Sequence, residues 1–245
     1  MIRSLLLSAA CLALSSPLAA EESDARRFFI ESNLLATYYH ELGHALIDVL
    51  QLPVLGREED AVDALATLLI HDIWEEESAT EMMRDVSYAW LWSDARSTEE
   101  GYEPAYWDTH SLDLQRHYTQ LCLFYGADPE KRAELVEEFE MPGERAEGCA
   151  EEYALAADSW DVMLEGLEER DQGRLRLVRG EEGGSYRKLI AEEVADFNRD
   201  YFLPVDVEVA LESCGEANAY YDPEARRITL CTEYADDLGA LWDAN

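Results

Sequence analysis

The chain has 245 residues and a formal net charge of −35 at pH 7, because 54 Asp and Glu residues outnumber 19 Lys and Arg residues. A charge of this size repels nucleic acid and anionic membrane surfaces, so both are excluded as partners. With 48% hydrophobic residues, the chain is long enough to fold as one large domain around a hydrophobic core.

The first twenty residues have the pattern of a secretory signal peptide. Arg3 supplies the positive start, an apolar stretch runs from Leu5 to Leu14, and small residues stand at Ala19-Ala20. The apolar stretch is too short to span a bilayer. We therefore expect cleavage near Ala20 and a secreted or periplasmic protein with no membrane partner after cleavage. Cys11 leaves a lipoprotein as the alternative.

An H-E-x-x-H motif, His40-Glu41-Leu42-Gly43-His44, lies in the apolar-periodic run from Phe28 to Leu50. Positions four apart lie on one face of an α-helix, so His40 and His44 can present two imidazoles to one metal ion, with Glu41 beside it. Gly43 costs about 1 kcal/mol relative to Ala in mid-helix, which predicts a close approach of another segment. A helix with two surface histidines is the alternative, since five residues can match by chance.

Each residue type in the motif suits zinc-dependent hydrolysis. Neutral imidazole binds Zn2+, three protein ligands leave the fourth position to water, and the bound zinc lowers the pKa of that water to about 7. Glu41 can then take the proton of the zinc-bound water and pass it to a leaving amine. The motif therefore predicts one zinc ion per chain, with Glu41 as general base and then general acid.

A second predicted helix starts at Arg57 and offers the third ligand. Glu59 and Asp63 are four positions apart and can both face the first helix. Glu59 would complete a His2Glu set, with Glu58 as its rival, and Asp63 would accept a hydrogen bond from the far ring nitrogen of a ligand histidine. The alternative is an acidic helix N-terminus, which the helix dipole favours without any metal.

The motif followed by E-x-x-x-D on the next helix resembles the gluzincin metallopeptidases, the thermolysin-like group. The longer stretches His40 to Asp48 and Leu52 to Asp60 are similar to a family of secreted bacterial proteins classed as zinc metallopeptidases. This resemblance covers nearly all of residues 21–245, and it implies a peptidase that acts on a peptide or protein substrate.

Four cysteines remain once Cys11 leaves with the signal peptide. In an oxidising compartment they predict two disulfides out of three pairings, and sequence proximity favours Cys122 with Cys149 and Cys214 with Cys231. A cysteine-rich metal site is the rival interpretation, but the chain has no C-x-x-C spacing.

Hydrophobic periodicity and turn residues predict the α+β class: a mainly helical, zincin-like single domain over residues 21–245 with a small antiparallel sheet or hairpin at the C-terminus. The expected helices cover residues 21–50, 57–73, 76–96, 111–125, 144–170 and 186–201. The expected strands are 175–178, 205–209 and the two arms of the hairpin.

The segment from Cys214 to Cys231 is predicted to be this hairpin, with its turn at Asp222 to Ala225. In the expected register Tyr221 pairs with Arg226. A bulge at Gly215 is then needed to bring the two cysteines together.

Within the hairpin, Asn218-Ala219-Tyr220-Tyr221 resembles the Asn-Ala-aromatic-aromatic strand with which thermolysin-like enzymes hold the substrate backbone. An edge strand does this by pairing with the bound peptide as an added strand. The resemblance implies a substrate-binding role for Asn218 and Ala219. Here the segment follows the zinc motif by about 170 residues instead of preceding it, so the order is permuted. An ordinary hairpin is the alternative.

His110 stands at the entrance of the helix expected over residues 111–125, where a lone histidine is most often a cap or a surface residue. Gluzincins assign stabilisation of the oxyanion to a His or Tyr outside the zinc helices. The resemblance therefore implies this catalytic role for His110 or Tyr220.

The sequence thus favours a secreted zinc-dependent metallopeptidase. A periplasmic binding or structural protein with a non-catalytic zinc site is the first alternative. A fourth zinc position closed by Asp60 or a cysteine thiolate would distinguish it. The second alternative is an amidase that acts on cell-wall peptides.

Overall fold

The computed structural model describes residues 17–165, 173–179 and 183–245, without the side chains of residues 17–22. The predicted signal peptide lies mostly outside the described residues, and the first helix begins at Pro17. Among the described residues, no helix combines the length and apolar character that a membrane span needs.

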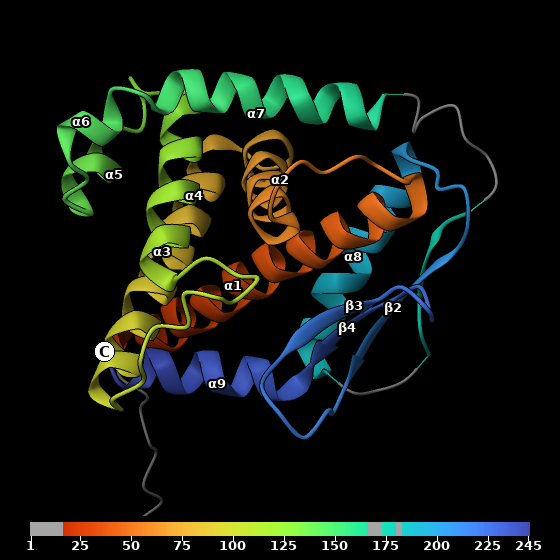
Figure 1. Ribbon diagram of the computed structural model, residues 1–245. Helices are drawn as coiled ribbons and strands as arrows, with labels where there is room; N and C mark the ends of the chain where they lie inside the picture. The colour runs from red at the N-terminus through yellow and green to blue at the C-terminus, as the bar shows by residue number, and fades with distance from the viewer. Residues whose placement is uncertain (1–16, 166–172, 180–182) are drawn as a thin grey trace, which may run out of the picture.

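The helix that carries the H-E-x-x-H motif, α1 (Pro17–Leu50), crosses the middle of the molecule (Figure 1). It packs against α2 (Glu58–Ile73), α3 (Glu76–Glu99) and α9 (Thr232–Asp243). More than half of the residues from Phe29 to Ile47 are buried apolar side chains. Since apolar side chains are buried on several sides of the helix, it forms the centre of the core.

The two halves of α1 contribute to different apolar clusters. The first half, with Phe29, Ile30 and Leu34, packs against residues of α3 and α9. The second half lies in the main core, which α2 and the sheet complete. The motif sits in this second half, so its helix is held from several sides.

Of the remaining helices, two pack against α2, two pack against the first of these, and the last packs against the sheet and α1. They are α4 (Asp113–Ala127), α5 (Ala133–Glu138), α6 (Gly143–Ala146), α7 (Cys149–Leu164) and α8 (Gly184–Asp200). The predicted helix over residues 144–170 is two helices, α6 and α7, and its last positions fall outside the described residues.

The C-terminal part forms a four-stranded sheet in the order β1-β2-β4-β3, from β1 (Leu175–Leu177), β2 (Val207–Glu212), β3 (Ala219–Asp222) and β4 (Arg227–Cys231). The predicted fold class, mainly helical with a small C-terminal sheet, is confirmed. The sheet is mixed: β3 and β4 form the predicted antiparallel hairpin, whereas β1, β2 and β4 run parallel. Strand β3 lies at the edge and packs against α1.

The hairpin register differs from the predicted one by two residues. Tyr221 pairs with Ile228 rather than with Arg226. Arg226 instead belongs to the turn, where it adopts a positive φ of 50°. The Asp222 carboxylate stabilises this longer turn by accepting hydrogen bonds from the backbone N–H groups of residues 224 and 225.

Both predicted disulfides are present, Cys122–Cys149 and Cys214–Cys231. The second does not need the bulge expected at Gly215. Cys214 stands two residues after the end of β2, and Cys231 ends β4, which runs parallel to β2 with Glu212 opposite Cys231. The disulfide therefore joins the ends of two adjacent parallel strands.

Asp85 of α3 offers a pH-dependent test of the packing between α1 and α3. Burial raises the pKa of its carboxyl to about 6, although the hydroxyl of Ser32 on α1 donates a hydrogen bond to it at 2.7 Å. The folded-state pKa lies above the unfolded value of about 3.9. Ionisation of Asp85 therefore lowers the stability of the folded protein as the pH rises from about 4 to about 6.

We expect Asp85→Asn to raise the free energy of unfolding by about 1–2 kcal/mol at pH 7 and to leave it unchanged near pH 4. Urea unfolding of both proteins at the two pH values measures this. A stabilisation of equal size at both pH values would show that ionisation of Asp85 is not its cause.

Candidate metal centre

A close contact between α1 and α2 positions the candidate metal ligands. A Cβ atom at Gly43 would lie 2.8 Å from Cβ of Val62 on α2, which is closer than real side chains approach. The close approach predicted from Gly43 is therefore present. It brings the first turn of α2, with its acidic residues, against the face of α1 that carries the histidines.

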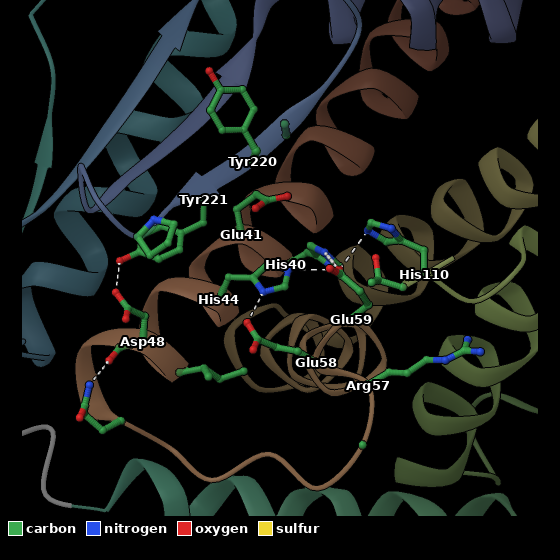
Figure 2. A pocket seen from close by; sticks show the side chains of 16 residues that line it. His40, Glu41, His44, Asp48, Arg57, Glu58, Glu59, His110, Tyr220 and Tyr221 are labelled. Atoms are coloured by element: carbon green, nitrogen blue, oxygen red, sulfur yellow. Dashed lines mark hydrogen bonds and ion pairs between the residues drawn. The ribbon is translucent and has the colours of Figure 1, made fainter. Parts of the chain in front are cut away.

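Three histidines surround one carboxylate oxygen (Figure 2). Oε2 of Glu59 lies 3.2 Å from Nε2 of His40, 3.2 Å from Nε2 of His44 and 3.0 Å from Nε2 of His110. For metal–ligand bonds of about 2.0–2.1 Å, donor atoms at the corners of a tetrahedron are about 3.3 Å apart. The spacing of these nitrogens from the oxygen is close to that of ligands around one zinc ion.

The donor atoms of His40, Glu59 and His110 all lie within 4.8 Å of one another, a group that could hold a metal ion. Imidazole nitrogen and carboxylate oxygen are ligands that zinc prefers. The residues present therefore fit a zinc ion. His44 approaches the same Glu59 oxygen from the next turn of α1, and the rings of His40 and His44 are 5.0 Å apart.

The other ring nitrogen of each motif histidine meets a carboxylate. Nδ1 of His40 lies 2.8 Å from Asp63, and Nδ1 of His44 lies 2.7 Å from Glu58. In this structure the two rivals for the third ligand thus take different places, with Glu59 at the Nε2 atoms and Glu58 behind His44. Such carboxylates fix the tautomer and orientation of ligand histidines.

Arg116 of α4 completes the support of His40. Its guanidinium donates two hydrogen bonds of 2.7 Å to the carboxylate of Asp63 and stacks 3.9 Å above the Trp90 ring. Burial raises the pKa of Asp63, but hydrogen bonds from His40 and Arg116 outweigh it and bring that pKa to about 2. Asp63 is therefore ionised across the physiological range and can hold the His40 ring in place.

The charges of the cluster favour an ionised carboxylate among the imidazoles. Burial raises the pKa of Glu59, but hydrogen bonds from His110, His40 and His44 hold it far below its ordinary value. Burial lowers the pKa of His40, and its bonds to Asp63 and Glu59 outweigh this and raise the pKa to about 9. A metal ion that binds here replaces protons on the imidazoles.

Glu41 is buried beside the histidines, and Figure 2 shows its side chain on the side of the cluster that faces β3. Burial raises the pKa of its carboxyl, and the nearby imidazoles of His40 and His44 oppose the rise. A carboxyl whose pKa is raised toward neutrality is better suited to exchange protons at neutral pH.

Two cavities meet at the cluster. The larger, of about 900 Å³, lies between the last turns of α1, the start of α2 and the strand residues Ala219 to Tyr221. The smaller, of about 270 Å³, lies on the other side between α1, α3 and α9. The residues that line both cavities are His40, Glu41, His110 and Ala219.

The predicted substrate-binding strand borders these cavities. Ala219 lines both of them, and Asn218 lines the smaller one. The hydroxyl of Tyr221 donates a hydrogen bond of 2.7 Å to Asp48, which ties β3 to α1. Figure 2 shows the Tyr220 ring directed away from the three histidines, so in this conformation its hydroxyl does not approach them.

His110 lies beside the candidate ligands, whereas the sequence suggested a cap, a surface residue or an oxyanion donor. It is 51 positions after Glu59 in the chain and on no shared helix, so no spacing rule connects the two. The one available indication was composition: the chain has five histidines, and three of them meet here. The hydrogen bonds from Arg116 to Asp63 likewise join residues far apart in the chain, and no local sequence pattern predicts them.

The fold and the cluster define a mainly helical α+β protein with a candidate metal centre on an H-E-x-x-H helix. The chain matches a family model described as "Putative metallopeptidase" over residues 15–164 and 179–245. This match covers well over half of its length, and the protein belongs to that family. No curated protein and no solved structure matches the chain.

We expect Arg116→Met to weaken zinc binding by about 10- to 100-fold, because Asp63 would lose the cation that holds it ionised and oriented behind His40. Competition with a zinc-binding dye measures the affinity. Arg84→Met is the matched control, since Arg84 binds Glu138 at 2.8 Å in an ion pair away from the cluster. Equal zinc affinity in Arg116→Met and wild type would contradict the supporting role.

Proposed function

We propose that this protein is a secreted zinc-dependent metallopeptidase of the gluzincin type. The observation that carries the proposal is the juxtaposition of three elements: the His40, His44 and Glu59 donors, the Glu41 carboxylate, and an edge strand that borders the same cavities. Family membership supports the class of reaction. The two disulfides support an oxidising compartment outside the cytoplasm.

His40, His44 and Glu59 would hold the zinc ion, and Asp63 and Glu58 would orient the two imidazoles. When bound, the metal would polarise the carbonyl of the substrate and lower the pKa of a water molecule, so no Ser or Cys nucleophile is required. Glu41 accepts a proton from the attacking water and returns it to the amine that leaves. Of the two residues considered for stabilising the oxyanion, Tyr220 remains the candidate, because a different role is proposed for His110 below.

The edge strand β3 can bind a peptide by its backbone. The backbone carbonyl of Asn218 accepts a hydrogen bond of 3.0 Å from the backbone N–H of Cys231, so Asn218 belongs to a hydrogen-bonded pair beside the β3–β4 ladder. Hydrogen-bonded and non-hydrogen-bonded pairs alternate along an antiparallel ladder. Ala219 and Tyr221 belong to non-hydrogen-bonded pairs, and they therefore direct their N–H and C=O groups away from β4. A peptide that pairs with them, replacing the Asn218 side-chain oxygen that accepts from the Ala219 N–H at 2.9 Å, adds a strand beside Glu41 and the metal ligands.

One observation favours the alternative of a non-catalytic zinc site. His110 approaches the same Glu59 oxygen as His40 and His44, and four protein ligands are typical of structural zinc. The residues that the sequence suggested as a fourth ligand, Asp60 and the cysteines, make other interactions. Asp60 accepts a hydrogen bond from Ser111, and the four cysteines that follow the predicted signal peptide form disulfides. The distinction therefore depends on His110.

The test offers the zinc-loaded protein a peptide mixture of known composition and, in parallel, cell-wall peptides, with the products identified by mass spectrometry. We expect new peptide termini that disappear after treatment with a chelator and return when zinc is restored. Cleavage limited to cell-wall peptides would favour the amidase. No cleavage of either substrate by a fully zinc-loaded protein would contradict the proposal.

A further inference from the structure

We propose that His110 is a displaceable fourth ligand, which closes the metal centre at rest and gives way when a peptide binds along β3. This inference rests on the proposed function for the identity of the displacing molecule. The presence of a removable fourth ligand can be tested without it.

The four candidate donors differ in how firmly the fold holds them. His40, His44 and Glu59 belong to α1 and α2, and their side chains are 8%, 15% and 17% exposed. His110 belongs to residues 101–112, which form neither helix nor strand, and its side chain is 47% exposed. The fourth donor can therefore move without unfolding a helix.

A few polar contacts near His110 fasten this loop to the start of α2. The Ser111 hydroxyl donates a hydrogen bond of 2.7 Å to Asp60 and accepts one of 3.0 Å from Arg57. The rest of the loop is poorly packed, since Tyr106 and Trp107 are 74% and 86% exposed. Release of the Ser111 contacts would free His110 together with its neighbours.

Space for the released imidazole lies on the far side of the loop. A third cavity, of about 400 Å³, lies between the loop, α3 and the start of α4. His110 lines this cavity as well as the two cavities at the metal centre. Because His110 borders all three cavities, an imidazole that leaves the metal centre has space to enter in the third cavity.

The path of a peptide along β3 explains why it would displace His110. A continuous chain that uses both cavities of the metal centre must pass the residues that line both, and these include His110 and Ala219. In the exchange, the coordinate bond from Nε2 of neutral His110 breaks and one from the peptide carbonyl oxygen forms. No electron or proton is transferred, so the charge of the centre is unchanged.

Cobalt(II) in place of zinc tests the fourth ligand directly, because its visible spectrum reports the coordination number. The probe is acetohydroxamate, a small chelating anion whose binding changes that spectrum. If His110 is bound in about nine of ten molecules, the apparent dissociation constant of the probe is about tenfold higher than without His110. We expect His110→Ala to bind acetohydroxamate about tenfold more tightly than wild type.

Two further variants sharpen the experiment. Ser111→Ala keeps the imidazole but loosens the loop, and an affinity between those of wild type and His110→Ala is expected. Tyr106→Ala changes an exposed side chain of the same loop and should behave as wild type. Equal spectra and equal probe affinities in wild type and His110→Ala would overturn the proposal.

The outcome also separates this inference from the proposed function. With the spectral difference intact, increased peptide cleavage by Ser111→Ala would support displacement by substrate. Absence of cleavage by every form, with the spectral difference intact, would overturn the peptidase assignment and substrate displacement, while the fourth ligand would stand.

Discussion

Replacement of Glu41 by Gln is expected to lower kcat/KM for peptide cleavage by a factor of about 10²–10⁴, which is the range that general acid–base catalysis contributes. Gln has nearly the same size and can occupy the same place beside the histidines, but it cannot accept the proton of water. Asp48, the other α1 acid that lines this cavity, accepts a hydrogen bond from Tyr221 instead of lying beside His40 (Figure 2).

Initial rates on one cleaved peptide, together with zinc content, measure the effect. We expect the Glu41→Gln protein to keep one zinc per chain, because Glu41 is not among the expected ligands. Glu77→Gln, at an exposed position of α3, should keep full activity. An active Glu41→Gln protein with its zinc intact would contradict the mechanism.

Replacement of Gly43 by Val is expected to destabilise the protein by about 3 kcal/mol and to weaken zinc binding at the same time. A Cβ atom alone would stand 2.8 Å from Cβ and Cγ1 of Val62, and the added methyl groups increase the overlap. Helix α2 would have to move away from α1. Since α2 carries Glu59, Glu58 and Asp63, this movement would separate the expected third ligand from the histidines.

Gly43→Ala separates the two effects. Alanine favours a helix by about 1 kcal/mol over glycine, which offsets part of the clash, so stability should change little while zinc affinity falls. Gly143→Ala is the control, because a Cβ there meets nothing within 4 Å. Urea unfolding and dye competition measure the two quantities. Unchanged zinc affinity in Gly43→Val would show that the contact does not position the site.

Local spacing explains which parts of the candidate site the sequence could indicate. His40, Glu41 and His44 share one helix, and Glu59 and Asp63 share the next, so the period of the helix alone groups them. The places of Glu58 and Glu59 relative to the two histidines needed the structure. The two residues are adjacent on the first turn of α2, and the packing of α2 on α1 sets Glu59 at the Nε2 atoms of His40 and His44 and Glu58 at Nδ1 of His44.

Contacts between distant segments explain which features could not be predicted from the sequence. His110 reaches Glu59 through the Ser111 contacts to Arg57 and Asp60, more than fifty positions away. The parallel pairing of β1 with β2 was also hidden, because α8 separates the two strands in the chain. The hairpin register depends on Arg226, which belongs to the turn with a positive φ instead of pairing with Tyr221. No side-chain pattern in the sequence predicts this φ.

The most direct test of the metal centre is the zinc content of the mature protein, purified without added metal or chelator, beside that of three variants. We predict one zinc per chain in wild type and Glu41→Gln, and none in His40→Ala or Glu59→Ala. Absence of zinc from wild type, even after dialysis against zinc, would contradict the metal centre on which the proposed function rests.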